Sequence, residues 1–433
     1  SEMCIRDRLR PDRISNPLTY SYYNSQHCKR CQYNFVKKCK IFYNELKSEV
    51  IKMKFVLAPD SFKESMTAKE VCIAMKNGIQ KVIPNAQITA VPMADGGEGT
   101  TDSLVDATGG QKYQINVTGP LNQKVSAYYG ISGDGQTAII EMAQASGLSY
   151  VAKSKRTPET ILKTTTYGTG ELINAALKHH VKKIIIGLGG SSTNDGGAGM
   201  AQALGVKFFD QNHHEITQKL AGGALDQIVN IDLSSINPRI KDTQFLLASD
   251  VTNPLTGPNG ASSVFGPQKG ADDTTVKILD QNLSHYAQVI EQTIDKNVAQ
   301  ISGSGAAGGL GAGLIAFTNA SIHPGVQLIA QETKLEAKIK DADYVFTGEG
   351  GTDFQTKFGK TPFGVAKIAK KYHIPVISLA GYLDQGIDQL YDEGFTAIFG
   401  ILAKAEDIEQ ALKDGPINVT RTTENIVRLI AQK

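Results

Sequence analysis

The chain has 433 residues, of which 41% are hydrophobic and 20% charged, and its formal net charge is +2. This length and composition predict an ordered globular enzyme of two domains and exclude a disordered or collagen-like chain, although glycine is abundant, with 43 residues against 15 prolines. No apolar run reaches the roughly 18 residues of a membrane span and no secretion signal is present, so we expect a cytoplasmic protein with no membrane partner.

The first 52 residues differ in composition from the remainder. They contain no glycine or alanine, and their basic charge leaves the other residues slightly acidic, so no nucleic-acid partner is expected for the main part of the chain. Four of the five cysteines lie in this segment, which excludes a disulfide framework for the rest. Two functional interpretations are a basic nucleic-acid arm and a zinc half-site of His27, Cys28, Cys31 and Cys39. We favour an extraneous or disordered leader, 1–52, with Met53 as the natural start.

From Met53 onward the sequence predicts parallel α/β units. Each unit is an apolar strand that runs into a Gly- or Asp-rich loop and then a helix. A capping box formed by Thr67 and Glu70 is expected to open the first helix. The five expected strands cover 54–58, 88–91, 183–187, 344–346 and 375–379.

Residues 111–143 follow a different pattern. Short runs of alternating apolar and polar residues are separated by Gly119-Pro120 and by Gly133-Asp-Gly135, which is typical of antiparallel hairpins. The expected fold is therefore α/β with two domains. A Rossmann-like parallel sheet is built from both chain ends, 53–114 plus 326–433, and a mixed-sheet domain, 115–325, is inserted into it.

Acidic side chains follow many of these strands. They are Asp60, Asp95, Glu98, Asp195, Asp250, Glu349 and Asp353. Because ligands of parallel sheets bind beyond the carboxyl ends of the strands, these loops are expected to meet at one site. Each acid alone could be a helix cap or a turn residue, but the concentration of carboxylates indicates Mg²⁺ and phosphoryl transfer. Lysines in the same loops suit phosphate or carboxylate groups: Lys63, Lys269, Lys357 and Lys360.

Two glycine-rich segments match nucleotide-binding patterns only in part. Gly303-Ser-Gly-Ala-Ala-Gly308 fits the dinucleotide fingerprint of a dehydrogenase, but a poor strand precedes it and no acid follows at the position that would hold a ribose. Gly359-Lys-Thr361 resembles the end of a P-loop, but Phe354 stands where the first glycine is required. We instead expect Thr361 to cap a helix that begins with Pro362 and whose N-terminus could bind an anion.

The most informative loop is Gly189-Gly-Ser-Ser-Thr-Asn-Asp-Gly-Gly-Ala-Gly199. It combines glycines that permit close backbone approach with three hydroxyls, an amide and a carboxylate, just before an expected helix. A purely structural loop rarely needs all of these groups.

Together these loops resemble the bacterial glycerate kinase family that is unrelated to Walker-loop kinases. The resemblance covers essentially all of 53–433 in the family's order. Its motifs are Ala58-Pro-Asp-Ser-Phe-Lys63, Pro92-Met-Ala-Asp-Gly-Gly-Glu-Gly-Thr100, Gly187-Leu-Gly-Gly-Ser-Ser-Thr-Asn-Asp-Gly-Gly-Ala-Gly-Met200, Asp250-Val-Thr-Asn-Pro254, Val264-Phe-Gly-Pro-Gln-Lys-Gly270, Gly305-Ala-Ala-Gly-Gly309 and Gly348-Glu-Gly350. Departures are minor: Glu64, Met66 and Ser192 stand where glycine, leucine and alanine are common.

The resemblance implies transfer of the ATP γ-phosphate to a hydroxyl of D-glycerate, with Mg²⁺, to give 2-phosphoglycerate. The 3-phospho product, a non-catalytic sugar-acid-binding protein and a nicotinamide dehydrogenase stay open as alternatives, as does a homo-oligomer.

We expect Asp195 to be the general base or hydroxyl orienter, with Asp60, Lys63 and Lys269 as further catalytic groups. Metal ligands are expected among Asp95, Glu98, Glu349 and Asp353. The expected substrate- and phosphate-binding residues are Ser61, Ser191, Ser192, Thr193, Asn194, Asp250, Asn253, Gly305, Gly308, Gly309, Lys360 and Thr361.

Overall fold

The computed structural model describes residues 53–432. The leader and the zinc half-site of His27, Cys28, Cys31 and Cys39 lie outside the described residues.

The strands are β1 Lys54–Leu57, β2 Gln87–Ala90, β3 Gln111–Thr118, β4 Lys124–Ile131, β5 Thr137–Glu141, β6 Lys183–Gly187, β7 Lys207–Phe209, β8 Asn230–Asp232, β9 Gln244–Ala248, β10 Ser321–His323, β11 Tyr344–Thr352, β12 Val376–Leu383 and β13 Ala397–Gly400. The α-helices are α2 Ala68–Gln80, α3 Thr100–Thr108, α4 Ala143–Ser146, α5 Pro158–Ile161, α6 Tyr167–Leu177, α7 Ala198–Ala203, α8 Ala261–Lys269, α9 Asp273–Ile294, α10 Leu310–Thr318, α11 Gly325–Glu332, α12 Leu335–Ile339, α13 Thr361–Lys370, α14 Ile408–Lys413 and α15 Gly415–Ile430.

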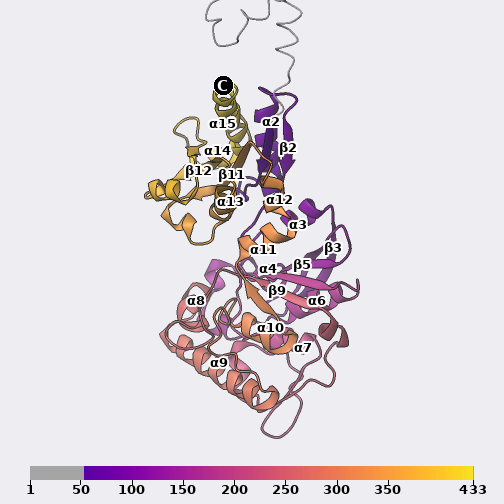
Figure 1. Cartoon of the computed structure of the whole chain (residues 1–433). Coiled ribbons are helices and arrows are strands. Elements are labelled where there is room, and N and C mark those ends of the chain that lie inside the picture. The colour runs from indigo at the N-terminus through magenta and orange to yellow at the C-terminus, as the bar shows by residue number, and fades with distance from the viewer. Residues whose placement is uncertain (1–52, 433) are drawn as a thin grey trace, which may run out of the picture. The chain divides into compact units, whose positions relative to one another are not determined.

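Five strands from both ends of the described chain form one parallel sheet. Its order is β13-β12-β11-β1-β2, so the first strand pairs with a strand that follows nearly 300 residues later, Phe55 opposite Tyr344. Figure 1 shows the indigo start and the yellow end of the chain in the same part of the molecule. The sheet confirms the prediction that both chain ends build a Rossmann-like layer.

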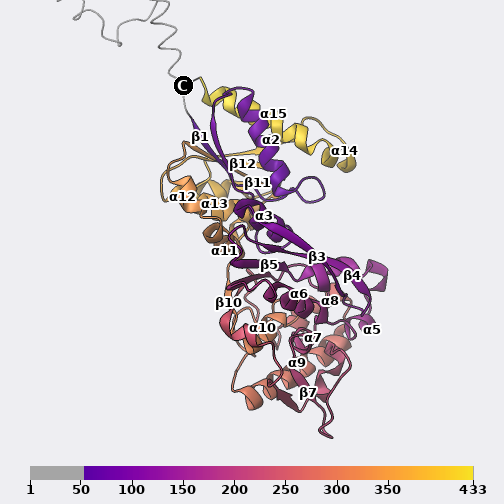
Figure 2. The ribbon, with the colours of Figure 1, turned by 90° about the vertical axis from the view of Figure 1, so that its right-hand side faces the viewer.

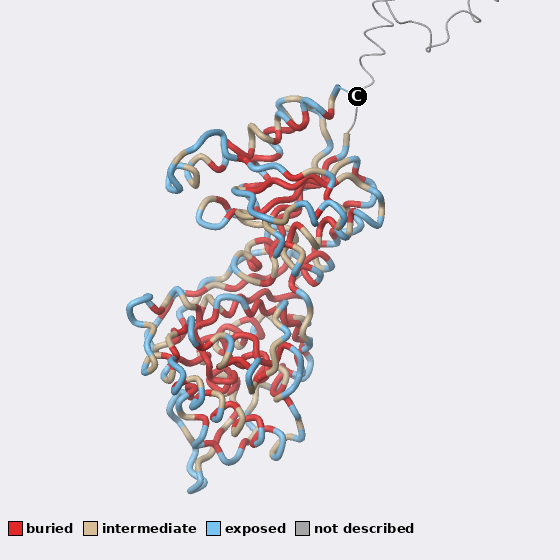
Figure 3. The backbone as a smooth tube through the Cα atoms, turned by 90° about the vertical axis from the view of Figure 1, so that its left-hand side faces the viewer, coloured by how far each residue is buried: buried red, intermediate tan, exposed pale blue. Residues whose placement is uncertain are grey.

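Both faces of this parallel sheet are buried, which explains its continuous apolar strands. Along β1, Phe55 and Leu57 face a cluster with α2 and α15, whereas Val56 faces a second cluster with α11 and α13. Helices α2 and α15 lie side by side (Figure 2), and Thr420 Oγ1 donates a 3.1 Å hydrogen bond to the Ala74 carbonyl across them. Figure 3 shows the strands of this sheet as a buried layer.

The second sheet is mixed and has six strands. Its order is β10-β9-β6-β5-β4-β3, in which β3, β4 and β5 pair antiparallel and the other pairs are parallel. The antiparallel part confirms the hairpin interpretation of residues 111–143. The predicted boundary between 114 and 115 falls inside β3, so a boundary before Gln111 fits the sheet better. The division into two domains remains a prediction.

Three local expectations need correction. The expected fourth strand, 344–346, continues as β11 to Thr352, because residues expected to form a loop keep pairing with β12. Five strands, β7, β8, β9, β10 and β13, were not among the expected ones. The cap of α13 is Lys360 rather than Thr361, because the Thr361 hydroxyl is engaged by Asp60. The capping box of Thr67 and Glu70 is confirmed.

Among residues 53–432, no helix is both long enough and apolar enough to cross a membrane.

Candidate active site

A cavity of about 660 Å³ opens at the carboxyl edge of the parallel sheet. Its walls come from the segments after β1, β2 and β13, from the second halves of β11 and β12, and from α14. Six residues predicted for the site line it: Asp60, Ser61, Lys63, Asp95, Glu349 and Lys360. The sheet therefore brings together residues that are up to 300 positions apart in the sequence.

Asp60 is fixed by three neighbouring segments. Its backbone N–H donates to the Gly348 carbonyl at 2.9 Å, which ties the end of β1 to β11. Thr361 Oγ1 donates to Asp60 Oδ2 at 2.6 Å, and the Ser61 N–H donates to Oδ1 at 2.6 Å. Burial, reinforced by repulsion from Asp95, raises the pKa of Asp60 to about 7 despite these hydrogen bonds. Asp60 is therefore poised to exchange a proton near neutral pH.

Lys360 balances the charges of Glu349 in β11 and of Asp353, which follows this strand. Its Nζ lies 3.3 Å from Glu349 Oε2 and 3.6 Å from Asp353 Oδ1. Burial raises the pKa of Glu349, while hydrogen bonds from Thr356 and Thr352 and the charge of Lys360 oppose that shift. Because β11 continues as a strand through Thr352, the Glu349 carboxylate is held by the sheet itself.

The hydroxyl-rich loop after β6 forms a second, more deeply buried cluster. Residues 191–195 are all buried. Lys269, at the end of α8, donates from Nζ to Ser191 Oγ at 2.8 Å and to the Thr193 carbonyl at 2.7 Å. Burial lowers the pKa of Lys269 to about 7, and the charge of Asp195 acts against that shift. The Ser192 hydroxyl donates to the Ser146 carbonyl. The hydrogen bonds of Lys269 and Ser192 thus stabilise the conformation of this loop.

Asp195 is fully buried and organises this loop. Its Oδ2 accepts hydrogen bonds from Thr166 N and Oγ1, both at 2.8 Å, and from Gly199 N at 3.3 Å, while Oδ1 accepts from Gly197 N at 3.1 Å. Burial raises its pKa, and the four donors oppose that shift. All these acceptor sites are used within the fold, so the geometry favours a positioning role. The predicted role as general base remains untested.

Other predicted binding residues surround the same buried loop. A Cβ added to Gly308, whose φ is +69°, would lie 1.9 Å from the Thr193 carbonyl oxygen, so this glycine permits the close approach of the two loops. The loop carrying Gly305 packs on the carbonyl of Pro254, and Asn253 donates to the Asn259 carbonyl. Thr193 Oγ1 and Asn194 Oδ1 are buried without a hydrogen-bond partner among the described residues.

The Asp95 loop connects the cavity to the strand ends of the mixed sheet. A Cβ added to Gly187, at the end of β6, would lie 2.5 Å from the Gly96 carbonyl oxygen. Asp250, after β9, accepts a 3.3 Å hydrogen bond from Gly325 N. Partial burial, together with repulsion from Asp95, raises the pKa of Asp250 to about 6 although solvent reaches this residue. Glu98 is exposed and does not line the cavity.

The carboxylates fit a magnesium ion that arrives with a phosphate-bearing ligand. Among residues 53–432, no group of three or more His, Cys, Asp or Glu side chains is arranged to hold a metal. Mg²⁺, however, commonly takes one or two protein carboxylates and completes its shell with phosphate oxygens and water. Asp95 meets this requirement, since its repulsion of Asp60 is what a divalent cation would relieve. Glu349 and Asp353 are already paired with Lys360.

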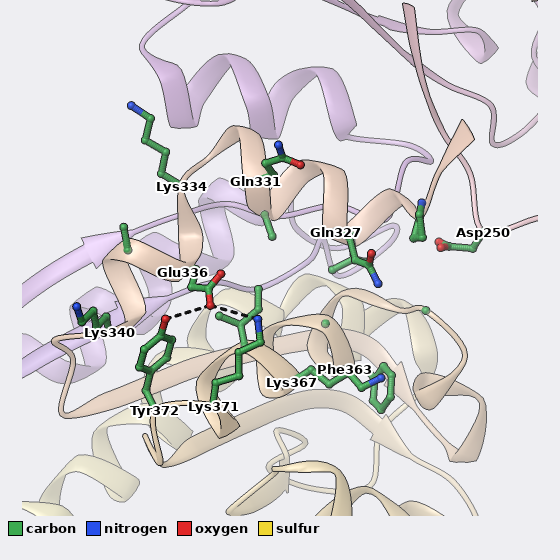
Figure 4. Close-up of a pocket in the computed structure, with 17 residues that line it drawn as sticks. Asp250, Gln327, Gln331, Lys334, Glu336, Lys340, Phe363, Lys367, Lys371 and Tyr372 are labelled. Carbon is green, nitrogen blue, oxygen red and sulfur yellow. Dashed lines mark hydrogen bonds and ion pairs between the residues drawn. The ribbon is translucent and has the colours of Figure 1, made fainter. Parts of the chain in front are cut away.

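A second cavity of about 890 Å³ lies along α11, α12 and α13 and is called here the basic groove. It is defined by four lysines: Lys334, Lys340, Lys367 and Lys371. Figure 4 shows Glu336 in this groove, accepting from Lys371 Nζ at 3.2 Å and from the Tyr372 hydroxyl at 3.0 Å. Of the predicted site residues, only Asp250 lines it. The sheet-edge cavity, with six of them, is the stronger candidate for the active site.

Comparison with known proteins identifies the family. The model of the glycerate kinase family matches residues 55–431. The chain belongs to the glycerate kinase family. It is 50% identical to a glycerate kinase of Halalkalibacterium halodurans over 86% of this chain and 96% of that protein, and 48% identical to a glycerate 2-kinase of Escherichia coli over 88% and 98%. A crystal structure from Salmonella typhimurium LT2, named for glycerate kinase 2, superposes with a TM-score of 0.80 at 45% identity and covers 88% of this chain and 98% of that one.

Some features of this family member's site were not visible in the sequence. Tyr382 and Glu406 line the sheet-edge cavity, but both lie in segments without a recognisable motif. The hydrogen bond from Thr361 to Asp60 joins positions 301 residues apart. Only the three-dimensional order of the strands reveals these neighbours.

Proposed function

We propose that this chain transfers the γ-phosphate of ATP to a hydroxyl of D-glycerate, and that the sheet-edge cavity is where the transfer takes place. The observation that carries the proposal is Asp60, a carboxylate with a pKa of about 7 that lines this cavity together with Lys63, Lys360 and Asp95. Membership in the glycerate kinase family supports the choice of substrate.

Asp60 meets more of the requirements for a general base than Asp195 does. It lines the cavity, and its pKa lies close to neutral pH, where a base is most effective. Removing the proton from the glycerate hydroxyl would prepare its oxygen for attack on the terminal phosphorus, while the departing phosphate oxygen leaves on ADP. Asp195 would then act at a distance, by holding the loop of Ser191 and Thr193 in place.

The charges of the cavity suit the remaining tasks. Lys63 and Lys360 would neutralise phosphate oxygens as negative charge shifts towards ADP. Asp95 would hold Mg²⁺, which supplies charge neutralisation at the phosphates when it is bound. Because Asp95 contributes to the raised pKa of Asp60, the proton affinity of Asp60 would depend on whether the cation is present.

We infer that the 2-hydroxyl is the acceptor, because the Escherichia coli relative is named for that position. The test is ADP release from ATP with D-glycerate and a panel of other hydroxy acids, followed by NMR of the product. The expected product carries phosphorus coupled to the proton on C2. Coupling to the C3 protons would overturn the regiochemistry. Turnover of another acid without turnover of D-glycerate would overturn the substrate.

Two other functions have less support. A dehydrogenase would need a strand before Gly303, and the described segment there forms turns that lead into α10. A non-catalytic sugar-acid-binding protein would not require a carboxylate with a pKa near 7 in its cavity, and absence of ADP release alongside tight glycerate binding would identify one.

A further inference from the structure

Glu406 is a buried carboxylate without a hydrogen bond. Both of its side-chain oxygens are inaccessible to solvent, and neither has a hydrogen-bond partner among the described residues. Its side chain is 6% exposed, and the ion-pair partner nearby is Lys404, whose Nζ lies 3.4 Å from Oε2 on a side chain that is 65% exposed. A buried acceptor without a donor is costly, so its retention calls for a donor from elsewhere.

Glu406 lines the sheet-edge cavity. Because the strand order is β13-β12-β11-β1-β2, the residues that follow these strands are spaced along one edge of the sheet. Glu406 lies in the segment after β13, whereas Asp60 follows β1 and Asp95 follows β2. Neighbouring strands are about 4.8 Å apart, so the row from β13 to β2 spans roughly 19 Å. The cavity can thus receive the two ends of an extended ligand at different strands.

Part of the cavity lining is apolar. Tyr382, Leu402 and Ile408 belong to it and are among the large hydrophobic side chains exposed in this structure, while Ile401 is buried. Exposed apolar side chains gathered in a cavity indicate that a flat or apolar part of a ligand covers them. The cavity therefore offers an apolar surface, the Glu406 carboxylate and the lysines Lys63 and Lys360.

We propose that this apolar lining holds the adenosine part of the nucleotide, with the Glu406 carboxylate turned towards it to accept hydrogen bonds from its ribose hydroxyls or its exocyclic amino group. Tyr382, Leu402 and Ile408 cover the base, and the phosphates extend over β11 and β1 towards Lys360 and Lys63. This inference rests on the proposed function, because it assumes that the nucleotide enters the sheet-edge cavity. The ribose hydroxyls and the amino group of the base are all hydrogen-bond donors, and the experiments below distinguish between them.

The first test replaces the carboxylate and measures nucleotide binding. Glu406→Gln and Glu406→Ala are expected to raise the KM for ATP, and the Kd of ADP measured by calorimetry, about 10- to 100-fold, as befits loss of a charge-assisted hydrogen bond. The KM for D-glycerate is expected to stay unchanged. Glu409→Gln is the matched control, since Glu409 lies on α14 with a side chain that is 79% exposed and pairs with Lys413 at the surface.

The second test identifies the donor by comparing nucleotides. Inosine triphosphate lacks the exocyclic amino group, and 2′-deoxy- and 3′-deoxy-ATP each lack one ribose hydroxyl. The analogue without the relevant donor should bind the wild-type protein as weakly as ATP binds the Glu406→Ala variant, and should lose nothing further in that variant. If all three analogues bind the wild type like ATP, no adenosine donor meets Glu406.

The outcomes separate this inference from the proposed function. Unchanged ATP and ADP affinities in both Glu406 variants, with normal glycerate turnover, would overturn the adenosine site and leave the kinase activity standing. If the Glu406 variants bind ADP more weakly than the wild type, but the wild-type protein turns over no glycerate, the adenosine site would stand and the proposed kinase activity would be overturned. If Glu406→Ala does not fold, as judged by its melting temperature, the isosteric Glu406→Gln variant decides.

Discussion

Thr361 Oγ1 donates a 2.6 Å hydrogen bond to Asp60 Oδ2 and so joins the start of α13 to the end of β1. This bond stabilises the ionised carboxylate and opposes the upward shift of its pKa. Thr361→Val removes the donor but keeps the shape of the side chain. The pKa of Asp60 should therefore rise by about one unit, and the acidic limb of the kcat/KM profile should move to higher pH by the same amount.

Thr361→Ser is the control for that variant, because it keeps the hydroxyl. Its profile should match the wild type. If the valine and serine variants share one profile, Asp60 is not the group whose ionisation limits the rate at low pH.

Asp60 and Asp195 are expected to fail in different ways when each is changed to asparagine. Asp60→Asn removes the proposed base and should lower kcat about 10²- to 10⁴-fold while the melting temperature is kept or raised, since a partly buried carboxylate repelled by Asp95 is lost. Asp195→Asn places an amide among four donors and should lower the free energy of unfolding by about 3 kcal/mol. A stable but inactive Asp195→Asn protein would contradict this expectation and indicate that Asp195 is the general base.

Lys269 should make stability rise with pH. Its folded pKa is about 7, and its ordinary value is 10.5. Between these values the unfolded chain holds a proton that the folded protein has lost, so the free energy of unfolding increases with pH and the gain is lost as pH falls to 7. From pH 7.5 to 9 the contribution is about 2 kcal/mol. Chemical denaturation should show this slope in the wild type and its absence in Lys269→Met. Equal slopes in the two proteins would contradict a buried neutral amine.

Lys360 should matter for nucleotide use far more than Lys357, three residues earlier. Lys360→Met removes the cation beside Glu349 and Asp353 and leaves the Glu349 carboxylate in the cavity without its ion-pair partner, so kcat/KM for ATP should fall about 100-fold. Lys357 pairs with Gln389, and Lys357→Met should stay within about twofold of the wild type in the same steady-state assay. Similar losses in both variants would show a general charge effect.

The sequence predicted the positions of five strands and their acidic loops, because apolar strands followed by Gly- and Asp-rich segments are strong local signals, but it did not predict β7, β8, β9, β10 and β13. It predicted the end of β11 poorly: glycines at 348, 350 and 351 suggested a loop, yet pairing with β12 continues to Thr352. It also could not reveal that Asp195 and Lys269 are buried, because burial depends on loops that arrive from distant positions, such as the one carrying Gly308. The charge of a side chain can be read from the sequence, whereas its access to a ligand depends on the three-dimensional fold.

The pairing of β1 with β11 has a consequence for how the protein is made. Tyr344 follows its partner Phe55 by 289 residues, and at about 5 to 20 residues per second a ribosome needs roughly 15 to 60 s to cover that distance. During this time β1 and β2 can pair only with each other, and a two-stranded sheet is marginal in water. All strands of the mixed sheet are synthesised before β11. The edge of β1 that later pairs with β11 therefore stays unpaired during synthesis. Growth temperature and translation speed should affect the yield of folded protein at this stage, before the residues of the active site come together.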